Sequence, residues 1–438
     1  MLKTGQIYLK KATANKLLVQ SIKIMFLRVF GIVVLFGFTL FLTHHYNPEI
    51  IGQYDFMRTF LLVVGSIAIL GTDQSILYFS GILRHEKNYS ELKKVYNKML
   101  LLILMISLLI LLVFLLIGQH RIVTFLNDTA IYPIMLRAVC LLFFYSVTLF
   151  NTEVFRALEI VYTAELFRNT FKYLSVIIGA VLLLNIGQEQ YLIDTFLVGF
   201  VFLSLISTLI IYRFFYRQSG KAGSEKFNYS YGYIIKKSYP IAISTMAIFL
   251  LTTLDVTFLK KFYGDKTVAQ YGVGVKMMTI VAMVIQMINI NVSTRIATLF
   301  YTKDYQQLQQ TLKNSTRMIV AFVLPVIFVV VIFSHEILMV FGSEYVVADK
   351  AMKIMILGQG VIALCGAAPV YLNMTGRQGI FQVVLILAVI LNFFLNMYLI
   401  PLFGIEGAAS AFIASMLFWN IVTVYIAYRK DRVKIFLH

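Results

Sequence analysis

Hydrophobic residues gather in long runs along this chain, and short polar stretches separate the runs. Each run is about 20 residues long, which is the length that an α-helix needs to cross a bilayer. The pattern therefore predicts twelve transmembrane helices. We place them at residues 22–43, 55–80, 98–118, 131–151, 168–187, 190–212, 238–259, 270–293, 315–334, 350–370, 379–400 and 406–428.

Composition supports a membrane protein over a soluble one. Hydrophobic residues make up 60% of the 438 positions and charged residues only 13%, whereas about a quarter of a soluble domain is charged. So much apolar surface requires the bilayer as a second solvent. The predicted fold class is all-α: a polytopic membrane protein whose transmembrane helices form two six-helix bundles.

The longest polar stretch, Arg213 to Lys237, separates the two halves and is the predicted linker. The segment before the first span alternates lysines with apolar residues, and it fits either an amphipathic helix on the inner membrane surface or a solvated tail. The predicted parts are a cytoplasmic amphipathic N-terminal segment 1–21, an N-terminal bundle 22–214, a cytoplasmic linker 215–237, a C-terminal bundle 238–430 and a cytoplasmic tail 431–438.

Three windows of the first half return in the second half at a nearly constant interval. Residues 45–54 match 262–271 at an offset of 217, 89–94 match 305–310 at 216, and 157–187 match 374–404 at 217. With six helices in each half, both copies start on the same side of the membrane. Two such halves around a central cavity are a common plan for transporters that work by alternating access.

Lysine and arginine predict the orientation. Most of the 38 basic residues fall in the two terminal segments and in every second loop, and the side rich in them is cytoplasmic by the positive-inside rule. The protein is therefore predicted to cross the membrane several times, with both termini on the cytoplasmic side. The net charge of +18 follows from this topology, so we do not expect a nucleic-acid partner.

A few charged side chains fall inside the predicted spans, where a basic residue costs about 2.5–3.5 kcal/mol on insertion scales. Such residues usually face a bundle interior or a water-filled cavity. Arg28, Arg58 and Lys276 are the candidate cavity cations. Asp73 and Asp255, together with Glu165 at the start of the fifth span, are candidates either for binding a coupling ion or for pairing with these cations.

A cationic cavity favours an anionic substrate, because guanidinium and ammonium groups bind phosphate oxygens. No His, Cys, Asp or Glu cluster has metal-ligand or catalytic spacing, so we expect no metal, cofactor or catalytic residue. Cys140 and Cys365 lie in apolar runs and are interpreted as small hydrophobic residues.

Three segments resemble a known family of membrane proteins. Asn47–Tyr54 is similar to the P-x-x-x-G-x-Y entrance to the second helix of polysaccharide-export flippases, and Phe155–Glu159 and Leu372–Arg377 resemble that family's two cytoplasmic repeat loops. The resemblance is to the O-antigen flippase (Wzx) type of the multidrug/oligosaccharidyl-lipid/polysaccharide exporter superfamily and spans nearly the whole chain. It implies the MATE-like flippase fold.

The resemblance also implies a function and a site. The expected function is translocation of undecaprenyl-pyrophosphate-linked oligosaccharide, the repeat unit of O-antigen (lipopolysaccharide) or of another surface polysaccharide, from the inner to the outer leaflet of a bacterial inner membrane. In the related lipid II flippase, arginines on the first, second and eighth helices hold the diphosphate, and Arg28, Arg58 and Lys276 stand on those helices here. A polysaccharide polymerase and a chain-length regulator are candidate partner proteins.

Three alternatives remain beside this interpretation. A multidrug cation antiporter of the same superfamily would favour carboxylates or aromatics over the cations of these spans. A membrane polysaccharide polymerase or a lipid-dependent glycosyltransferase would carry a long outer loop with paired catalytic residues, and the outer loops here are short. A structural protein without transport activity fits the repeat and the buried cations least well.

Overall fold

The structure is a computed structural model that describes residues 2–86, 88–218 and 229–436, with side chains described from residue 23. Residues 219–228 of the predicted linker and the last two residues of the predicted tail lie outside this part of the chain. The described residues form α-helices, one π-helix and two 3-10 helices joined by short connections, so the all-α prediction is confirmed. They divide into two compact units.

The first unit comprises Met1–Phe38, Ala68–Leu111 and Val139–Ile241. Five of the described helices have residues in both units, among them α1 (Leu2–His45), α4 (Tyr89–Leu126) and α10 (Tyr231–Leu251). The helices that lie wholly in the first unit are α3 (Thr72–His85), α6 (Leu142–Ala157), α7 (Val161–Leu166), the π-helix η1 (Phe167–Phe171), α8 (Lys172–Ile186), the 3-10 helix η2 (Glu189–Tyr191) and α9 (Leu192–Gln218).

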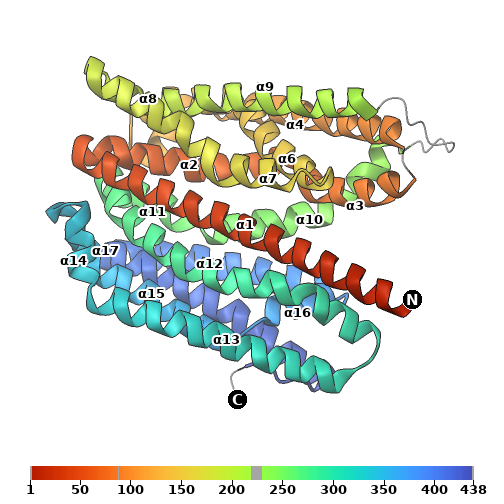
Figure 1. Cartoon of the computed structure of the whole chain (residues 1–438). Helices are drawn as coiled ribbons and strands as arrows, with labels where there is room; N and C mark the ends of the chain where they lie inside the picture. The colour runs from red at the N-terminus through yellow and green to blue at the C-terminus, as the bar shows by residue number, and fades with distance from the viewer. Residues whose placement is uncertain (1, 87, 219–228, 437–438) are drawn as a thin grey trace. The chain divides into compact units, whose positions relative to one another are not determined.

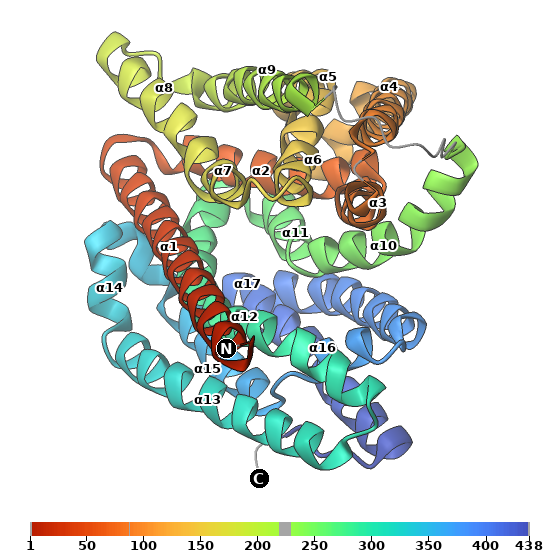
Figure 2. The same cartoon turned by 45° about the vertical axis from the view of Figure 1, so that its right-hand side comes forward.

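Helix α6 is central to the first unit and contacts both α3 and α9, while α8 runs beside α9 (Figures 1 and 2). The core between these helices is aromatic and fully buried at Phe79, Tyr96 and Phe150. The rings of Tyr96 and Phe150 stack with centroids 5.7 Å apart. The Tyr96 hydroxyl donates to Asn151 Oδ1 at 3.0 Å, so this polar group is satisfied within the core.

The second unit comprises Thr39–Ile67, Leu112–Ala138 and Ala242–His438. Beyond the shared helices it contains most of α2 (Pro48–Ile69) and α5 (Ile131–Cys140). Its remaining helices are α11 (Leu254–Tyr263), α12 (Asp265–Tyr301), α13 (Tyr305–Ile332), α14 (Ser334–Phe341), the 3-10 helix η3 (Ser343–Ala348), α15 (Asp349–Leu364), α16 (Ala368–Met374) and α17 (Gln378–Asp431).

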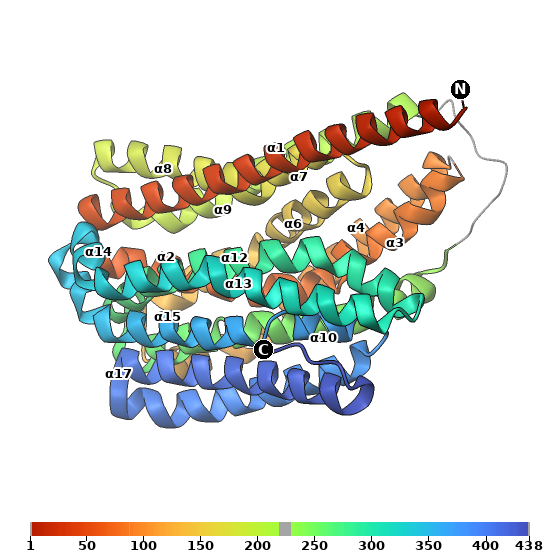
Figure 3. The same cartoon turned by 60° about the horizontal axis from the view of Figure 1, so that its bottom comes forward.

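In the second unit α12 packs against α13 and α15 (Figure 3). Helix α17 packs against α11, α15 and α16. Buried Tyr371, Phe381 and Leu385 lie at the centre of an apolar core between α12, α16 and α17. The unit includes two segments of the first half of the sequence, so the compact units do not coincide with the predicted bundles 22–214 and 238–430. The bundle boundaries therefore stay a prediction.

Nine helices of the described chain are long and apolar enough to cross a membrane, and two bent helix pairs bring this number to eleven. The 54-residue α17 is one of the nine, but it breaks at Gly404. The chain reverses its direction at this break. A hydrogen bond from Asn392 Nδ2 to the Ala411 carbonyl, 3.4 Å long, joins the two arms and shows that they run side by side. Figure 3 shows the two arms of α17 side by side. If each arm of α17 is counted as one span, the total of eleven rises by one and agrees with the predicted number of about twelve.

Several helices are longer than the predicted spans, among them α1, α4, α12 and α13. The segment 2–21 continues into the first span without a break, as the N-terminal part of α1. Helix α4 runs past the predicted end of its span at residue 118 to Leu126, with a kink at Gly118. The hydrophobic pattern predicts the membrane-embedded part of a helix, and polar residues that extend the same helix do not change that pattern.

Helix boundaries recur at the interval of the sequence repeat. Helix α2 begins at Pro48 and α12 at Asp265, 217 positions later. The same interval separates the start of α7 at Val161 from the start of α17 at Gln378. Helix α8 ends at the left-handed Gly187, and α17 breaks at Gly404, again 217 positions later. The matched sequence windows thus form matched local structure.

Large apolar side chains line the outer faces of the helices. On α4, Met105, Leu108, Leu112 and Leu116 are each more than half exposed. A row of this kind on a soluble protein would be an aggregation site, but hydrocarbon tails solvate it without cost.

Candidate functional site

Two of the three predicted cavity cations share one carboxylate in the second unit. Lys276 on α12 donates from Nζ to Asp55 Oδ2 on α2 at 2.8 Å. Arg58, one turn after Asp55 on α2, places a guanidinium nitrogen 3.5 Å from Asp55 Oδ1. The side chains of Lys276 and Asp55 are 6% and 3% exposed, and Arg58 is 30% exposed. Arg58 is therefore the accessible member of a buried cluster with one more positive than negative charge.

Gly272 makes room for this cluster. A Cβ atom at this position would lie 2.6 Å from Asp55 Oδ2, too close for any real contact. Glycine therefore lets the backbone of α12 approach the carboxylate. Position 272 lies 217 residues after position 55, so the aspartate of one repeat faces the glycine that occupies its place in the other repeat.

Asp55 was missed as a site residue. The sequence search singled out charges that lacked a topological explanation, and Asp55 lies at the edge of the second predicted span. Two signals were available: Asp55 precedes Arg58 by three positions on one helix face, and it follows Tyr54, the last residue of a repeat window. Its pairing with Lys276, 221 positions away, is a tertiary contact.

The third predicted cation, Arg28, lies in the first unit and forms a two-point ion pair there. Its Nη2 and Nε atoms donate to the two carboxylate oxygens of Glu165 on α7, at 2.8 and 3.2 Å. Asn169 adds a hydrogen bond from Nδ2 to Glu165 Oε2 at 3.0 Å. Glu165 is 2% exposed and Arg28 is 26% exposed, so the structure places a predicted carboxylate beside a predicted cation.

The other two predicted carboxylates do not lie against basic groups in this way. Asp255 accepts from the Tyr271 hydroxyl at 2.5 Å and from the Val256 backbone amide at 2.9 Å, and it is buried. Asp73 lies in the first turn of α3, where the positive end of the helix dipole stabilises a carboxylate. Its neighbour Gln74 donates to it at 3.4 Å.

A second buried cation was not predicted. Lys260 on α11 is 2% exposed and donates to Asp128 Oδ2 and Asp265 Oδ2, both at 2.5 Å. Lys260 directly follows the predicted span 238–259, at a membrane edge where lysine usually reaches solvent. Its two acidic partners come from the segment after α4 and from the first turn of α12, so no local pattern connects them.

The arrangement is suited to binding anions. Arg58 and Arg28 present guanidinium groups that are partly exposed, and each forms an ion pair with a carboxylate that an anionic ligand could replace. Among the described residues no group of three or more His, Cys, Asp and Glu side chains is placed to hold a metal ion. The clusters thus offer charge and hydrogen bonds for binding.

Two protein families match this chain. The family described as polysaccharide biosynthesis protein matches residues 66–294, which is more than half of the chain. The MatE family matches residues 240–399. A curated relative, the probable low-salt glycan biosynthesis flippase Agl15 of Haloferax volcanii, is 28% identical over 259 residues. The matched region covers 57% of this chain and about half, 51%, of that relative.

Solved structures show the same fold. The lipid II flippase MurJ in an inward closed conformation is similar with a TM-score of 0.70 at 13% identity, over 93% of this chain and 87% of that one. The MATE multidrug transporter DinF-BH has a TM-score of 0.67 at 18% identity, over 95% of this chain and 94% of that one. The chain is therefore a multi-pass membrane protein with the fold of MATE transporters and MurJ, and it belongs to the polysaccharide biosynthesis protein family.

Proposed function

We propose that this protein is a flippase that moves a lipid-linked oligosaccharide across a bacterial inner membrane. The cargo would be a repeat unit of O-antigen or another surface polysaccharide on undecaprenyl pyrophosphate, carried from the cytoplasmic to the outer leaflet. The observation that carries this proposal is the buried Lys276–Asp55–Arg58 cluster on helices of transmembrane length. Family membership and a relative named as a glycan biosynthesis flippase support it.

The cluster suggests how the cargo is held. Asp55 is the anion that neutralises Lys276 in this structure, and it also lies beside Arg58. A pyrophosphate that approaches the exposed Arg58 would compete with Asp55 for the Lys276 ammonium, so substrate binding would exchange one buried anion for another. Such an exchange avoids leaving a charge uncompensated in a medium of low dielectric constant.

We propose Arg28 as a further phosphate ligand, since it offers a fork of donors to paired oxygens. Glu165 then acts as its ion-pair partner in the empty protein. Asp73 and Asp255 are not required for coupling, because an inside-negative potential favours outward movement of anions by about 2.3 kcal/mol per charge per 100 mV. Outward transport is consistent with cytoplasmic termini. The basic residues of the loops support that placement of the termini.

A deletion strain of the source organism tests the function. We expect lipid-linked oligosaccharide to accumulate in the inner leaflet and surface polysaccharide to be lost, with wild-type chain restoring both. Arg58→Ala should fail to restore export at normal protein level. Lys276→Ala should also fail, and export is compared per amount of protein because Asp55 then lacks its buried partner. Lys266→Ala is the matched control, because Lys266 is on the same helix as Lys276 but is 57% exposed.

Two outcomes would decide against the proposal. Unchanged delivery of the sugar to the outer leaflet in the deletion strain would remove the flippase function. Raised sensitivity to cationic drugs with normal surface glycan would favour the multidrug antiporter instead. Partner proteins such as a polymerase and a chain-length regulator would act on the delivered product, and loss of either would leave the leaflet distribution of the precursor unchanged.

A further inference from the structure

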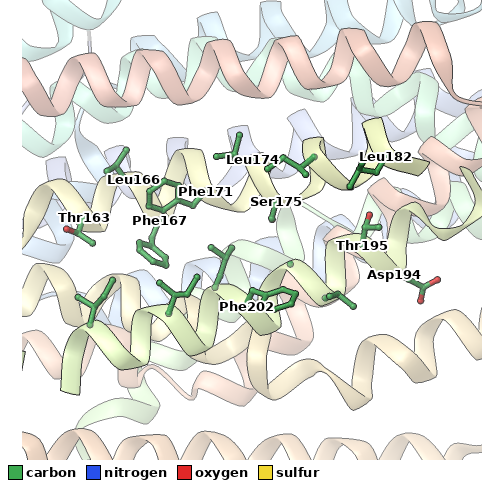
Figure 4. Close-up of a pocket in the computed structure, with 17 residues that line it drawn as sticks. Thr163, Leu166, Phe167, Phe171, Leu174, Ser175, Leu182, Asp194, Thr195 and Phe202 are labelled. Carbon is green, nitrogen blue, oxygen red and sulfur yellow. The ribbon is translucent and has the colours of Figure 1, made fainter. Parts of the chain in front are cut away.

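The first unit contains an apolar groove of about 900 Å³ between α7, η1 and α8 on one side and α9 on the other (Figure 4). This volume lies at the upper end of the roughly 300–1,000 Å³ of ligand sites. Phe167, Phe171 and Leu174 form one wall, and Phe202 belongs to the opposite wall. Leu174 and Phe202 are 43% and 61% exposed, so the groove opens to the surroundings of these apolar helices.

The groove has the length of a membrane crossing. On the α7–η1–α8 side it extends from Thr163 to Leu182. At 1.5 Å per residue this is roughly 28 Å, close to the ~30 Å thickness of the hydrocarbon core. Thr163 marks the end that the basic loops predict to be cytoplasmic, and Asp194 and Thr195 mark the other end (Figure 4).

Small residues create the groove. A Cβ atom on Gly179 would lie 2.7 Å from the Thr195 side chain, so α8 and α9 approach closely at the floor of the groove. At the positions 217 residues after Ser175 and Gly179 the second repeat has Asn392 and Asn396. Both asparagines are fully buried, and Asn396 donates to Asn392 at 2.9 Å. The two repeats therefore differ at the positions that form this groove.

At the predicted cytoplasmic end of the groove, the helical turns that form the wall also carry residues that form ion pairs. Glu165 precedes the lining residue Leu166 and binds Arg28. Arg168 follows the lining residue Phe167 and binds Glu153. These turns include the π-helix η1, a distortion that is frequent at functional sites. The ion pairs at this end involve Arg28, Arg156 and Arg168 with Glu153 and Glu165. Asp73 is within electrostatic reach of Glu153.

We infer that this groove holds the isoprenoid tail of the lipid-linked substrate while its diphosphate lies at the arginine-bearing end. The inference rests on the proposed flippase function. Arg28, the proposed phosphate ligand, is bonded to the turn at which the groove begins, so one molecule can contact both. The aromatic and aliphatic lining suits an unsaturated, methyl-branched chain, and the guanidinium groups at the end suit its diphosphate.

Photolabelling tests the inference. The purified full chain, in vesicles of phosphatidylethanolamine and phosphatidylglycerol, is exposed to a polyisoprenyl diphosphate that carries a diazirine in its tail. Peptide mass spectrometry locates the labelled residues. We expect labels on α8 and α9 along the groove, and we expect unlabelled undecaprenyl diphosphate to suppress them while added phosphatidylglycerol does not.

A matched pair of variants tests whether the labelled site is the groove. Ile178 lines it and is 54% exposed, whereas Val181 is on the same helix, 41% exposed and outside the lining. Ile178→Trp fills the groove and should lower labelling about tenfold, equivalent to about 1.4 kcal/mol of binding free energy. Val181→Trp should label like the wild type.

Three results would overturn the inference: equal competition by phosphatidylglycerol, labelling of Ile178→Trp at the wild-type level, or labels only outside α7, η1, α8 and α9. The labelling is independent of transport. A wild-type protein that translocates substrate without labelling in the groove would refute only the tail site. A labelled protein that translocates nothing would refute the flippase function and leave lipid binding in place.

Discussion

Lys276 on α12 donates a 2.8 Å hydrogen bond to Asp55 on α2, and 221 positions of sequence separate the two residues. Both side chains are almost completely buried. In a low-dielectric interior each charge depends on the other, because removal of one partner leaves the second uncompensated. This mutual dependence, with Arg58 beside the same carboxylate, gives the cluster a testable energetic signature.

Lys276→Met should destabilise the protein by about 3–5 kcal/mol, because Asp55 would lose its closest partner in a buried site. The measurement is the midpoint of thermal unfolding in detergent. Lys266→Met, on the same helix at an exposed position, should shift the midpoint little. The double variant Lys276→Met with Asp55→Asn should recover part of the loss, since it removes both charges. Additive losses would show that the pair is not coupled.

Gly272→Ala should disturb the same pair from the other side. The new methyl group would meet Asp55 Oδ2 at 2.6 Å, so the carboxylate or the helix must shift, at a cost of about 1–3 kcal/mol. Thermal unfolding again reports this cost. Gly379→Ala is the control, because nothing lies within 4 Å of its added Cβ. A Gly272→Ala protein as stable as the control would contradict the close approach of α2 and α12.

Substitution of Lys260 is expected to lower the free energy of unfolding more than substitution of either of its acidic partners. Lys260→Met would leave Asp128 and Asp265 facing each other without the shared cation, and we expect a loss of about 3–5 kcal/mol. Asp128→Asn keeps the Lys260–Asp265 contact and should cost only about 1–3 kcal/mol. Unfolding midpoints of the two variants give the comparison. The reverse order would mean that Lys260 reaches solvent.

Tyr271→Phe should weaken the second unit by about 1–3 kcal/mol, because buried Asp255 would lose the hydroxyl that donates to it. Unfolding midpoints in detergent measure the loss. Tyr263→Phe serves as the control, since the hydroxyl of Tyr263 makes a long, exposed 3.3 Å bond to the Pro401 carbonyl. Equal midpoints for the two variants would argue that Asp255 finds another donor.

Hydropathy predicted the spans because a transmembrane helix must be apolar over about 20 residues whatever its neighbours are. The same logic identified Arg28, Arg58 and Lys276, since a charge in such a run is costly wherever it points. The predicted spans began at residues 55 and 270, whereas the helices begin at Pro48 and Asp265, which are separated by the 217-residue interval of the repeat.

What the sequence did not predict are pairings. Asp55 with Lys276, and Lys260 with Asp128, join segments whose proximity depends on how the helices pack. The groove along α8 and α9 was missed for a related reason. Gly179 and Ser175 look like ordinary small residues in an apolar run, and only the contact of Gly179 with Thr195 shows that they bring two helices together.

The central claim is that the chain translocates a lipid-linked glycan, and reconstitution tests it most directly. Purified protein is placed in vesicles with undecaprenyl diphosphate that carries a fluorescent oligosaccharide, and a membrane-impermeant quencher reports the outer-leaflet fraction over time. We predict that the wild type makes the inner-leaflet probe accessible, that Lys266→Ala does the same, and that Lys276→Ala slows the process strongly. Wild-type vesicles that quench only to the level of protein-free vesicles would contradict the account.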